Sequence, residues 1–416
     1  MPAEESPNDK SPETAELPLE GVRIVEFGHM VMGPTCGLVL ADMGADVIKV
    51  EPLEGDKTRT LIGAGSGFFP YFNRNKRSLA LDLKSEAGMA IVRKLIAGAD
   101  VVTENFRPGA MDKLGLGYET LKREHPALIY CSLKGFLKGP YDHRTALDEV
   151  VQMMGGLAYM TGPTGRPLRA GASINDIMGG MFGTVGILAA LRERDRTGHG
   201  QLISSALFET CVMLIGQHMA QYAVTGTPAS PMPERLAAWA IYEIFDTRGG
   251  EQVFLGVVTD TQWEVFCREF ERPDLFADET LSTNVKRAQA RDRLIPIVKE
   301  ICLRHTKQEM MDIFERIGLP FAPITKPHEL YDDPHLKESG GLLDVTVPGS
   351  GKKTKMPALP FEMAGRRFGV HRDIPAIGQD SRTILSDLGY ADAEIDALVR
   401  DGIVCDGIGR DGAKKS

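Results

Sequence analysis

Short β-forming runs that alternate with helix-forming segments constrain the fold of this chain most. Residues 22–27 are mainly apolar and β-forming, residues 36–43 have the composition of a helix that Gly44 ends, and residues 46–50 form the next apolar run. A strand, a helix and a second strand at this spacing make a βαβ unit, whose two strands lie parallel in one sheet. Further strands are expected at 79–83, 100–103 and 128–133, and a helix at 85–97. The sequence therefore predicts an α/β protein.

Polar and cationic segments lie next to these predicted strands. Residues 73–78 form a basic turn, and residues 104–110 directly follow the strand at 100–103. Ligands of open α/β sheets bind at the carboxyl ends of strands, where cations hold phosphates, although surface ion pairs explain a single cluster equally well. Gly28 and Gly33 lack the G-x-G-x-x-G spacing of dinucleotide-binding proteins. A dinucleotide-dependent oxidoreductase is therefore disfavoured.

The character of the chain changes at Gly226. Residues 226–234 are rich in Pro, Ser and Thr, which is typical of a linker. Two strands and three amphipathic helices are predicted after it, at 241–245, 252–258, 261–271, 288–305 and 307–317. We therefore expect a small α+β domain at 226–327 and a large domain formed by 17–225 and 328–404. The ends, 1–16 and 405–416, are expected to be a disordered tail and a flexible tail.

Composition excludes several classes of function. A net charge of −9 argues against nucleic acid as a partner, because phosphate binding needs a positive field. The six cysteines occur singly and form no metal-binding pattern with histidines, which indicates reduced thiols and no metal site. Gly and polar residues interrupt the apolar runs, and residues 1–16 have no apolar core of a signal peptide. We expect a cytoplasmic protein that does not enter a membrane.

Two aspartates precede apolar helical segments. Asp148 begins a segment whose apolar residues recur at helical spacing up to Met160, and Asp176 precedes an apolar helix expected at 177–192. An acid at this position usually caps the helix that it precedes, because its oxygens accept the unpaired backbone N–H groups and its charge suits the helix dipole. From local sequence alone, both residues are therefore helix caps.

The motifs of the chain, taken in order, resemble those of the class III CoA-transferases of the CaiB/BaiF type, such as formyl-CoA transferase. The resemblance extends from about residue 17 to 400. It rests on the segments 17–22, 41–52 and 73–78, on 104–109 with 113–115, on 134–136 and 148–152, on the turn 198–201, and on 318–323 and 377–379. Colinear agreement of this length is more specific than any single motif.

The resemblance implies a fold and a set of site residues. The family has a Rossmann-like large domain built from both ends of the chain, a small domain between them, and two subunits threaded through each other as an interlocked homodimer. In this reading Asp148 is the catalytic aspartate. The residues that match positions holding the coenzyme are Asn105, Phe106, Ala110, Lys113 and Lys134, with Lys49 and Arg77 in matching basic segments and Met30 in the loop 29–32.

The implied chemistry needs no metal and no permanently bound cofactor, because the coenzyme A thioester is itself a substrate. The aspartate attacks the acyl-CoA thioester, passes through a mixed anhydride to an aspartyl-CoA thioester, and returns the coenzyme to an acceptor carboxylic acid. Backbone N–H groups near Gly33 or in a small-domain loop would stabilise the oxyanions. Succinyl-CoA is a candidate donor, with Arg169 or Arg74 as candidate partners of its second carboxylate.

Two alternatives remain open. An α-methylacyl-CoA racemase of the same fold needs an acid/base pair, but the residue before Asp148 is Leu147 where racemases have a histidine. Asp176 matches the second acid of the racemases, but transferases of this family also have an aspartate there, and we expect it to cap a helix. A non-catalytic CoA-binding subunit is disfavoured because Asp148 is present. Val31 replaces a glutamine, and the glycine-rich lid is missing at 256–260, which argues against oxalate as the acid. His29 is expected to be structural.

Overall fold

A computed structural model describes residues 17–235 and 238–407 of the chain. The chain divides into two compact units, the first containing the described residues of Met1–Pro233 and Pro334–Ser416, and the second Glu234–Asp333. Residues 226–233 thus group with the first unit and residues 328–333 with the second. The expected tail at 1–16 lies outside the described residues, as do residues 408–416.

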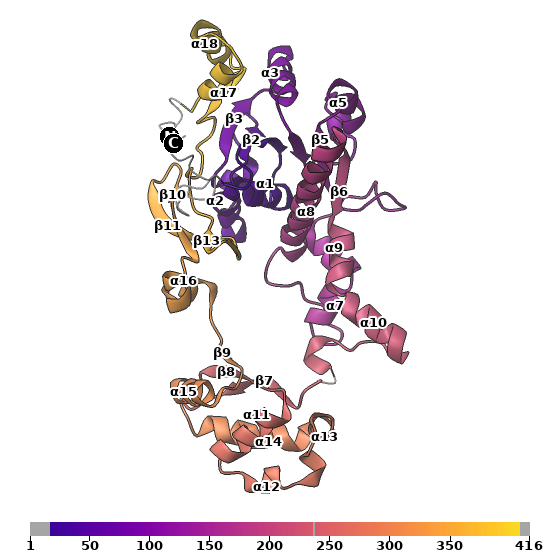
Figure 1. Cartoon of the computed structure of the whole chain (residues 1–416), viewed down its shortest axis with the longest axis vertical. Helices are drawn as coiled ribbons and strands as arrows, with labels where there is room; N and C mark the ends of the chain where they lie inside the picture. Colours follow the sequence, from indigo (N-terminus) through magenta and orange to yellow (C-terminus); the bar gives the residue numbers. More distant parts are fainter. Residues whose placement is uncertain (1–16, 236–237, 408–416) are drawn as a thin grey trace, which may run out of the picture. The chain divides into compact units, whose positions relative to one another are not determined.

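A seven-stranded sheet forms the centre of the first unit (Figure 1). Its strand order is β14-β3-β2-β1-β4-β5-β6, and only β14 is antiparallel to its neighbour. The strands are β1 (Arg23–Phe27), β2 (Asp46–Glu51), β3 (Arg77–Leu81), β4 (Val101–Glu104), β5 (Ile129–Lys134), β6 (Leu202–Ala206) and β14 (Val404–Cys405). The predicted α/β class with a largely parallel sheet is confirmed. Cys405, placed in a flexible tail by the sequence, instead pairs with Ala80 of β3.

Alternate residues of each strand enter two apolar cores, because successive side chains of a strand point to opposite faces. Ile24 packs on one face with α1 (Met32–Asp42) and α8 (Ile174–Thr197). Val25 packs on the other with α3 (Glu86–Ala97), α5 (Tyr118–Glu124), α17 (Ser381–Asp387) and α18 (Asp392–Arg400). Both ends of the chain therefore contribute to this unit.

Helix α8 lies against α1 through glycines. A Cβ atom added at Gly180 would lie 2.6 Å from the carbonyl oxygen of Met32, and one at Gly179 would lie 2.5 Å from the Met32 side chain. At Gly180 the contact is with backbone, so that position has no room for a methyl group, whereas at Gly179 only the flexible end of the Met32 side chain would have to move. By length and composition alone α8 could cross a membrane, but its glycine face is packed inside this unit.

The remaining elements of the first unit are shorter. Between β1 and β6 lie α2 (Phe68–Phe72), α4 (Ala110–Lys113), α6 (Asp148–Met154) and α7 (Leu157–Thr161), and after β6 come α9 (Leu207–Leu214) and α10 (Gly216–Thr225). Helices α9 and α10 meet at Ile215. The C-terminal part adds α16 (Pro334–Glu338) and the hairpins β10 (Leu342–Val347) with β11 (Lys352–Pro357) and β12 (Glu362–Met363) with β13 (Arg366–Arg367).

The second unit has its own core. Its antiparallel sheet has the order β7-β8-β9, with β7 (Ile241–Asp246), β8 (Gln252–Val257) and β9 (Phe321–Pro323). Five helices belong to it: α11 (Asp260–Glu269), α12 (Pro273–Phe276), α13 (Asn284–Gln289), α14 (Arg291–Leu303) and α15 (Lys307–Ile317). Capping boxes at Thr259 and Thr306 start α11 and α15. β7, β8, α11, α14 and α15 correspond to predicted segments, whereas β9, α12 and α13 were not predicted.

Candidate active site

Asp148 is the first residue of α6, yet its carboxylate caps a different helix. Its Oδ1 atom accepts hydrogen bonds from the backbone N–H groups of Asn175 and Asp176, at 2.8 and 3.1 Å. Both belong to the first turn of α8, whose own N-cap residue, Ser173, makes no side-chain capping bond. The Asp148 side chain is 7% exposed. The predicted capping role is therefore real, but the capped helix is α8.

The second oxygen of Asp148 is also occupied. Its Oδ2 atom accepts a hydrogen bond of 2.5 Å from Nε2 of Gln152, one helical turn later on α6. Gln152 is fully buried, and its Oε1 atom accepts the backbone N–H of Ala170 at 2.8 Å. Nη2 of Arg169 lies 3.9 Å from the same Asp148 oxygen. Three donors and one cation thus hold this carboxylate in place.

Asp176 lies beside Asp148 and has the opposite character. It belongs to the first turn of α8, is half-buried, and its carboxylate accepts no hydrogen bond from the described part of the chain. Burial and the neighbouring charge of Asp148 raise the pKa of Asp176 to about 7, against a smaller lowering by Arg169. Asp176 was expected to cap α8; in the structure it is the unpaired carboxylate of a close acidic pair.

The start of α1 adjoins the turn that carries Asp176. Ile177 packs on the cluster formed by Val31, Leu38 and Phe72, and Gly180 touches the backbone of Met32. Val31, the N-cap residue of α1, makes no side-chain capping bond, so the N–H groups of the first turn have no side-chain acceptor there. The amino ends of α1 and α8 therefore lie next to each other, and Asp176 belongs to the turn of α8 at this contact.

The loop before α1 is joined to the end of β4. Asn105 accepts a hydrogen bond from the His29 backbone at 3.0 Å and donates one to the His29 carbonyl at 2.8 Å. Nδ1 of His29 lies 3.1 Å from the same Asn105 oxygen, and burial lowers the pKa of His29. Met30, next in the loop, has a left-handed backbone with φ 63° and is 38% exposed. His29 is thus a structural link, and Met30 is presented outward.

Four other predicted coenzyme-binding residues lie near Asn105, at the carboxyl ends of β4 and β5. Nζ of Lys134 donates to Glu104 at 2.6 Å and to the carbonyl of Phe106 at 3.0 Å. Phe106 is half-buried and its ring lies 5.7 Å from that of His29. Ala110 and Lys113 begin and end the short helix α4, and the Lys113 side chain is exposed. The structure brings these residues together at one edge of the sheet.

Arg77 is placed differently. It is the first residue of β3, and its guanidinium lies 3.3 Å from Asp46 at the start of β2 and 2.9 Å from Asp387 of α17. The side chain is 10% exposed. Both partners are structural carboxylates, so the structure does not bring Arg77 to Asn105 and Lys134.

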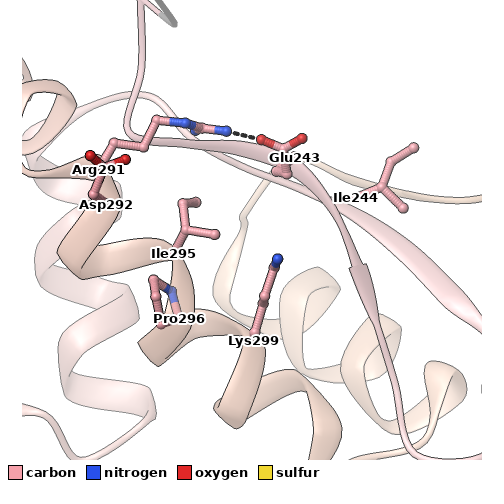
Figure 2. Close-up of a pocket in the computed structure, with 7 residues that line it drawn as sticks. All are labelled: Glu243, Ile244, Arg291, Asp292, Ile295, Pro296 and Lys299. Atoms are coloured by element: carbon pink, nitrogen blue, oxygen red, sulfur yellow. Dashed lines mark ion pairs between the residues drawn. The ribbon is translucent and has the colours of Figure 1, made fainter. Parts of the chain in front are cut away.

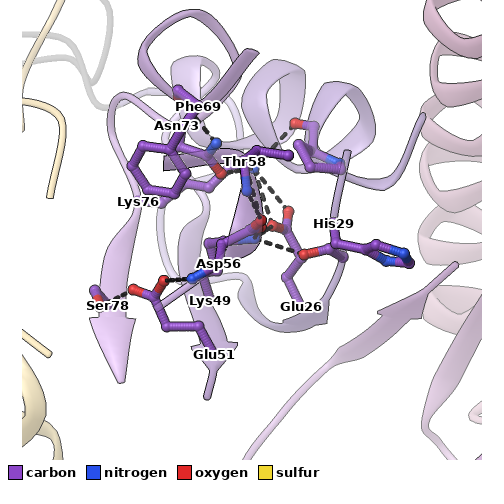
Figure 3. Close-up of polar contacts among 12 residues, drawn as sticks. Glu26, His29, Lys49, Glu51, Asp56, Thr58, Phe69, Asn73, Lys76 and Ser78 are labelled. Atoms are coloured by element: carbon purple, nitrogen blue, oxygen red, sulfur yellow. Dashed lines mark hydrogen bonds and ion pairs between the residues drawn. The ribbon is translucent and has the colours of Figure 1, made fainter. Parts of the chain in front are cut away.

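Lys49 belongs to a buried network rather than to a surface (Figure 3). Its Nζ atom lies 2.8 Å from Asp56 and 3.6 Å from Glu26, and it donates a hydrogen bond of 2.5 Å to the carbonyl of Gly28. Lys76 binds the other side of Glu26 at 2.8 Å, and burial lowers the pKa of Lys76 to about 8. Figure 3 shows these side chains converging behind the His29 loop. Lys49 is therefore inaccessible to a phosphate, contrary to the idea that it contacts the coenzyme.

Two cavities of about 390 Å³ each lie elsewhere. One is on β7 and α14 in the second unit, where Arg291 pairs with Glu243 and Lys299 lines the same hollow (Figure 2). The other is an apolar hollow between α7 and α10, lined by residues such as Tyr159, Met219 and Tyr222. Neither contains a predicted site residue. No group of His, Cys, Asp or Glu in the described residues could hold a metal ion.

Sequence reasoning missed that the Asp176 carboxylate lacks hydrogen-bond donors among the described residues and that Gln152 is a partner of Asp148. For Gln152 the signal was its spacing of four residues from Asp148 on a helix, which puts both side chains on one face. For Asp176 local sequence offers no distinguishing signal, because it precedes an apolar helix just as Asp148 does. Only the folded chain shows which of the two has its oxygens free.

Comparisons with known proteins identify the family of this chain. The family described as CoA-transferase family III matches residues 19–381 of the chain. The succinyl-CoA:glutarate CoA-transferase of Mus musculus is 32% identical over 93% of this chain and 90% of its own length. The succinyl-CoA–D-citramalate CoA-transferase of Chloroflexus aurantiacus is 32% identical over 89% and 94%.

Solved structures give the same answer. A CAIB/BAIF family protein from Brucella suis has a TM-score of 0.79 at 32% identity, covering 90% of this chain and all of its own. A hypothetical protein from Mycobacterium tuberculosis has a TM-score of 0.76 at 28% identity, covering 88% of this chain and 98% of its own. The family match, the sequence relatives and the shared fold lead to one conclusion: this chain belongs to CoA-transferase family III and is a CoA-transferase.

Proposed function

We propose that Asp176, rather than Asp148, is the covalent nucleophile of this CoA-transferase, and that Asp148 holds Asp176 in place. One observation carries the proposal: both oxygens of Asp148 accept hydrogen bonds from protein donors, whereas the neighbouring carboxylate of Asp176 accepts none from the described residues. A nucleophile needs a free lone pair that can approach the thioester. Asp148, predicted as the nucleophile from the sequence, accepts three hydrogen bonds from α8 and Gln152, which occupy most of its lone pairs.

The electrostatics of the pair support the same division of roles. Burial and a neighbouring negative charge raise the proton affinity of a carboxylate, and carboxylates in different surroundings can take different tasks. Asp148 accepts three hydrogen bonds, which suits an ionised group that only accepts. Asp176 has a pKa of about 7, because burial and Asp148 disfavour its charge. A carboxylate anion that its surroundings stabilise only weakly is a stronger nucleophile toward an acyl group.

The reaction follows in four balanced steps. The Asp176 carboxylate attacks the thioester carbonyl of the donor, forming a mixed anhydride and releasing CoA thiolate. The thiolate attacks the Asp176 carbonyl, which releases the donor acid and leaves an aspartyl-CoA thioester. The acceptor carboxylate attacks this thioester and frees the thiolate again, with a second anhydride on Asp176. The thiolate then attacks the acceptor's acyl carbon and restores the carboxylate. Each step exchanges one activated acyl bond for another, so no external energy source is needed.

The first turn of α1 is the proposed source of oxyanion donors. The N–H groups of Met32 and Gly33 lie at an amino end without a side-chain cap, and that end touches the turn that bears Asp176. Backbone donors fixed before the reaction stabilise the tetrahedral oxyanion without reorganising. The hydrogen bonds between His29 and Asn105 fix the loop that leads into this turn.

The coenzyme is proposed to lie along the edge formed by the carboxyl ends of β4 and β5. Asn105 and Phe106 directly follow β4, Lys134 ends β5, and the helix α4 runs from Ala110 to Lys113. Lys113 is exposed, so its ammonium is free for a phosphate. Met30 is turned outward beside them. Arg77 is left out of this set, because Asp46 and Asp387 hold its guanidinium.

Succinyl-CoA is the proposed donor, and a carboxylic acid the acceptor. The relatives named above use succinyl-CoA with glutarate or D-citramalate, as their names state. We also propose that the active form is an interlocked homodimer in the cytoplasm. The racemase alternative gains no support, because Leu147, 61% exposed, cannot exchange a proton beside this acid pair.

Trapping the intermediate on a defined peptide tests the nucleophile. Trypsin separates the two aspartates, since cleavage after Arg144, Arg169 and Arg192 gives one peptide of residues 145–169 and another of 170–192. The protein is incubated with succinyl-CoA, treated with hydroxylamine and digested. A hydroxamate on the 170–192 peptide supports Asp176; one on the 145–169 peptide would return the role to Asp148. The matched variants Asp176→Asn and Asp148→Asn should lose and keep the label, respectively.

A further inference from the structure

Arg169 is a half-exposed cation with unused donors beside the acidic pair. Its Nε atom donates to the carbonyl of Ala170 at 3.0 Å, and Nη1 donates to Glu149 at 2.5 Å. Nη2 lies 3.9 Å from Oδ2 of Asp148, too far for a hydrogen bond, and makes none with the described residues. The side chain is 38% exposed. Two of its three nitrogens are therefore anchored, and the third presents free N–H groups at the site.

Arg74, the other arginine that the sequence leaves open, cannot have this role. Its side chain is 1% exposed, and its Nη2 lies 2.7 Å from Asp42, which is fully buried. Its Nε also donates to both oxygens of Asp42. A buried and paired guanidinium of this kind holds the chain together and is closed to a ligand.

We propose that Nη2 of Arg169 binds the distal carboxylate of a short aliphatic dicarboxylic acid whose other end reacts at Asp176. This inference rests on the proposed function and adds to it the residue that selects the substrate class. A guanidinium anchored through two nitrogens is already ordered, so little further entropy is lost when a carboxylate binds the third.

The local charges favour this occupant at the right moment. Asp148 and Asp176 would repel a free carboxylate, but in the proposed reaction Asp176 is a CoA thioester when the acceptor arrives and carries no charge. Hydrogen bonds from two backbone N–H groups and from Gln152 already stabilise the charge of Asp148. Arg169 then faces a second carboxylate with its charge shared with Asp148, which three hydrogen bonds already stabilise, and with Glu149, which is 62% exposed and screened by water. A monocarboxylic acid of the same length would leave these donors unused.

The test compares acceptors that differ at the distal end only. Transfer of CoA from succinyl-CoA to glutarate and to its monomethyl ester is measured for wild type, Arg169→Gln and Arg169→Lys. Arg166→Gln is the matched control, because Arg166 is an exposed arginine of the same segment. Loss of a charge-assisted hydrogen bond should lower the kcat/KM preference for glutarate over the ester by about 10- to 100-fold in Arg169→Gln. Arg169→Lys should restore part of the preference, and Arg166→Gln should leave it unchanged.

The ratio of the two acceptors separates recognition from a supporting role. If Arg169 served only to hold the acidic pair, its removal would slow both acceptors equally, and an unchanged ratio would overturn the inference while the transferase function stood. Calorimetric titration of free glutarate and of the ester into Asp176→Asn and into the double variant Asp176→Asn/Arg169→Gln, both of which lack the charge of Asp176, gives an answer independent of turnover. Binding of glutarate that Arg169→Gln abolishes supports the inference even if no CoA is transferred. Equal binding by both proteins refutes it.

Discussion

The backbone N–H of Asp176 donates its hydrogen bond to the side chain of Asp148, over 3.1 Å. One aspartate thus fixes the main chain of the other and, at the same time, raises its proton affinity. Position and reactivity of Asp176 are coupled through a single contact, because the oxygen that accepts the N–H also carries the repelling charge. Substitutions at Asp148 should therefore change both.

Replacing Asp148 by alanine should destabilise the first unit. The change removes the cap of α8 and leaves the N–H groups of Asn175 and Asp176 without their acceptor, which costs about 1–3 kcal/mol. Thermal and urea unfolding measure the change. The matched variant Asp176→Ala removes a carboxylate that no described residue binds, and it should not lower the transition midpoint. A larger loss in Asp176→Ala than in Asp148→Ala would contradict the assigned roles.

Asp176→Asn should abolish transfer while Asp148→Asn reduces it. Removal of a covalent nucleophile lowers kcat by at least about 10³-fold. Asp148→Asn keeps an oxygen acceptor for α8, so a loss of about tenfold is expected from altered positioning. Steady-state transfer assays give both values. Near-complete loss in Asp148→Asn with activity retained in Asp176→Asn would reverse the assignment.

The first acylation step should depend on pH around neutrality. Asp176 reacts as the carboxylate, and its pKa is about 7, so the single-turnover rate should rise with pH through that region. Asp148→Asn removes a neighbouring negative charge that raises this pKa, and the rise should therefore move to lower pH. Rapid-quench measurements across the pH range provide the profile. A profile that Asp148→Asn leaves in place would show that another group controls it.

The same raised pKa predicts a pH dependence of stability. The unfolded chain releases the Asp176 proton near pH 4 and the folded chain near pH 7, so the folded state binds more protons between these values. The contribution of Asp176 to the free energy of unfolding must fall as pH rises through that window. Asp176→Asn should accordingly gain stability relative to wild type at pH 8 but not at pH 4, as measured by urea denaturation. An equal difference at both values would be inconsistent with the raised pKa.

Lys49 and Lys113 should respond to substitution in opposite ways. Lys49→Met leaves Asp56 and Glu26 buried with less compensating charge, and unfolding should become easier by about 3–5 kcal/mol. Lys113→Met removes an exposed cation at the proposed coenzyme edge, and should raise the KM for succinyl-CoA about 3- to 10-fold without changing the melting temperature. Calorimetry and initial rates separate the two effects. A Lys49→Met protein that is as stable as wild type but binds the coenzyme more weakly would show that Lys49 does contact the coenzyme.

Much of the large sheet could be predicted from the sequence, because its strands are short apolar runs with clear boundaries such as Gly44 after the first helix. The grouping of Asn105 with Lys134 also follows, since parallel strands end at the same edge. The two aspartates could not be told apart, because a capping acid is recognised locally while the helix that it caps depends on tertiary structure. Likewise, Lys49 and Lys134 are both strand lysines, and only the packing around them shows that Lys49 is enclosed.

Gly180 sets how closely α8 approaches α1 beside the proposed active site. Its missing side chain lets α8 approach the Met32 carbonyl to a separation that any Cβ atom would prevent. The distance between the proposed nucleophile Asp176 and the N–H donors of α1 therefore depends on a glycine at position 180. An alanine at this position would push α8 away from α1, while the central sheet would keep its structure. The Gly180→Ala protein would fold and bind its coenzyme, but it would transfer CoA slowly. A substitution at a residue that touches no reacting atom would then have the same effect on activity as the loss of an active-site residue.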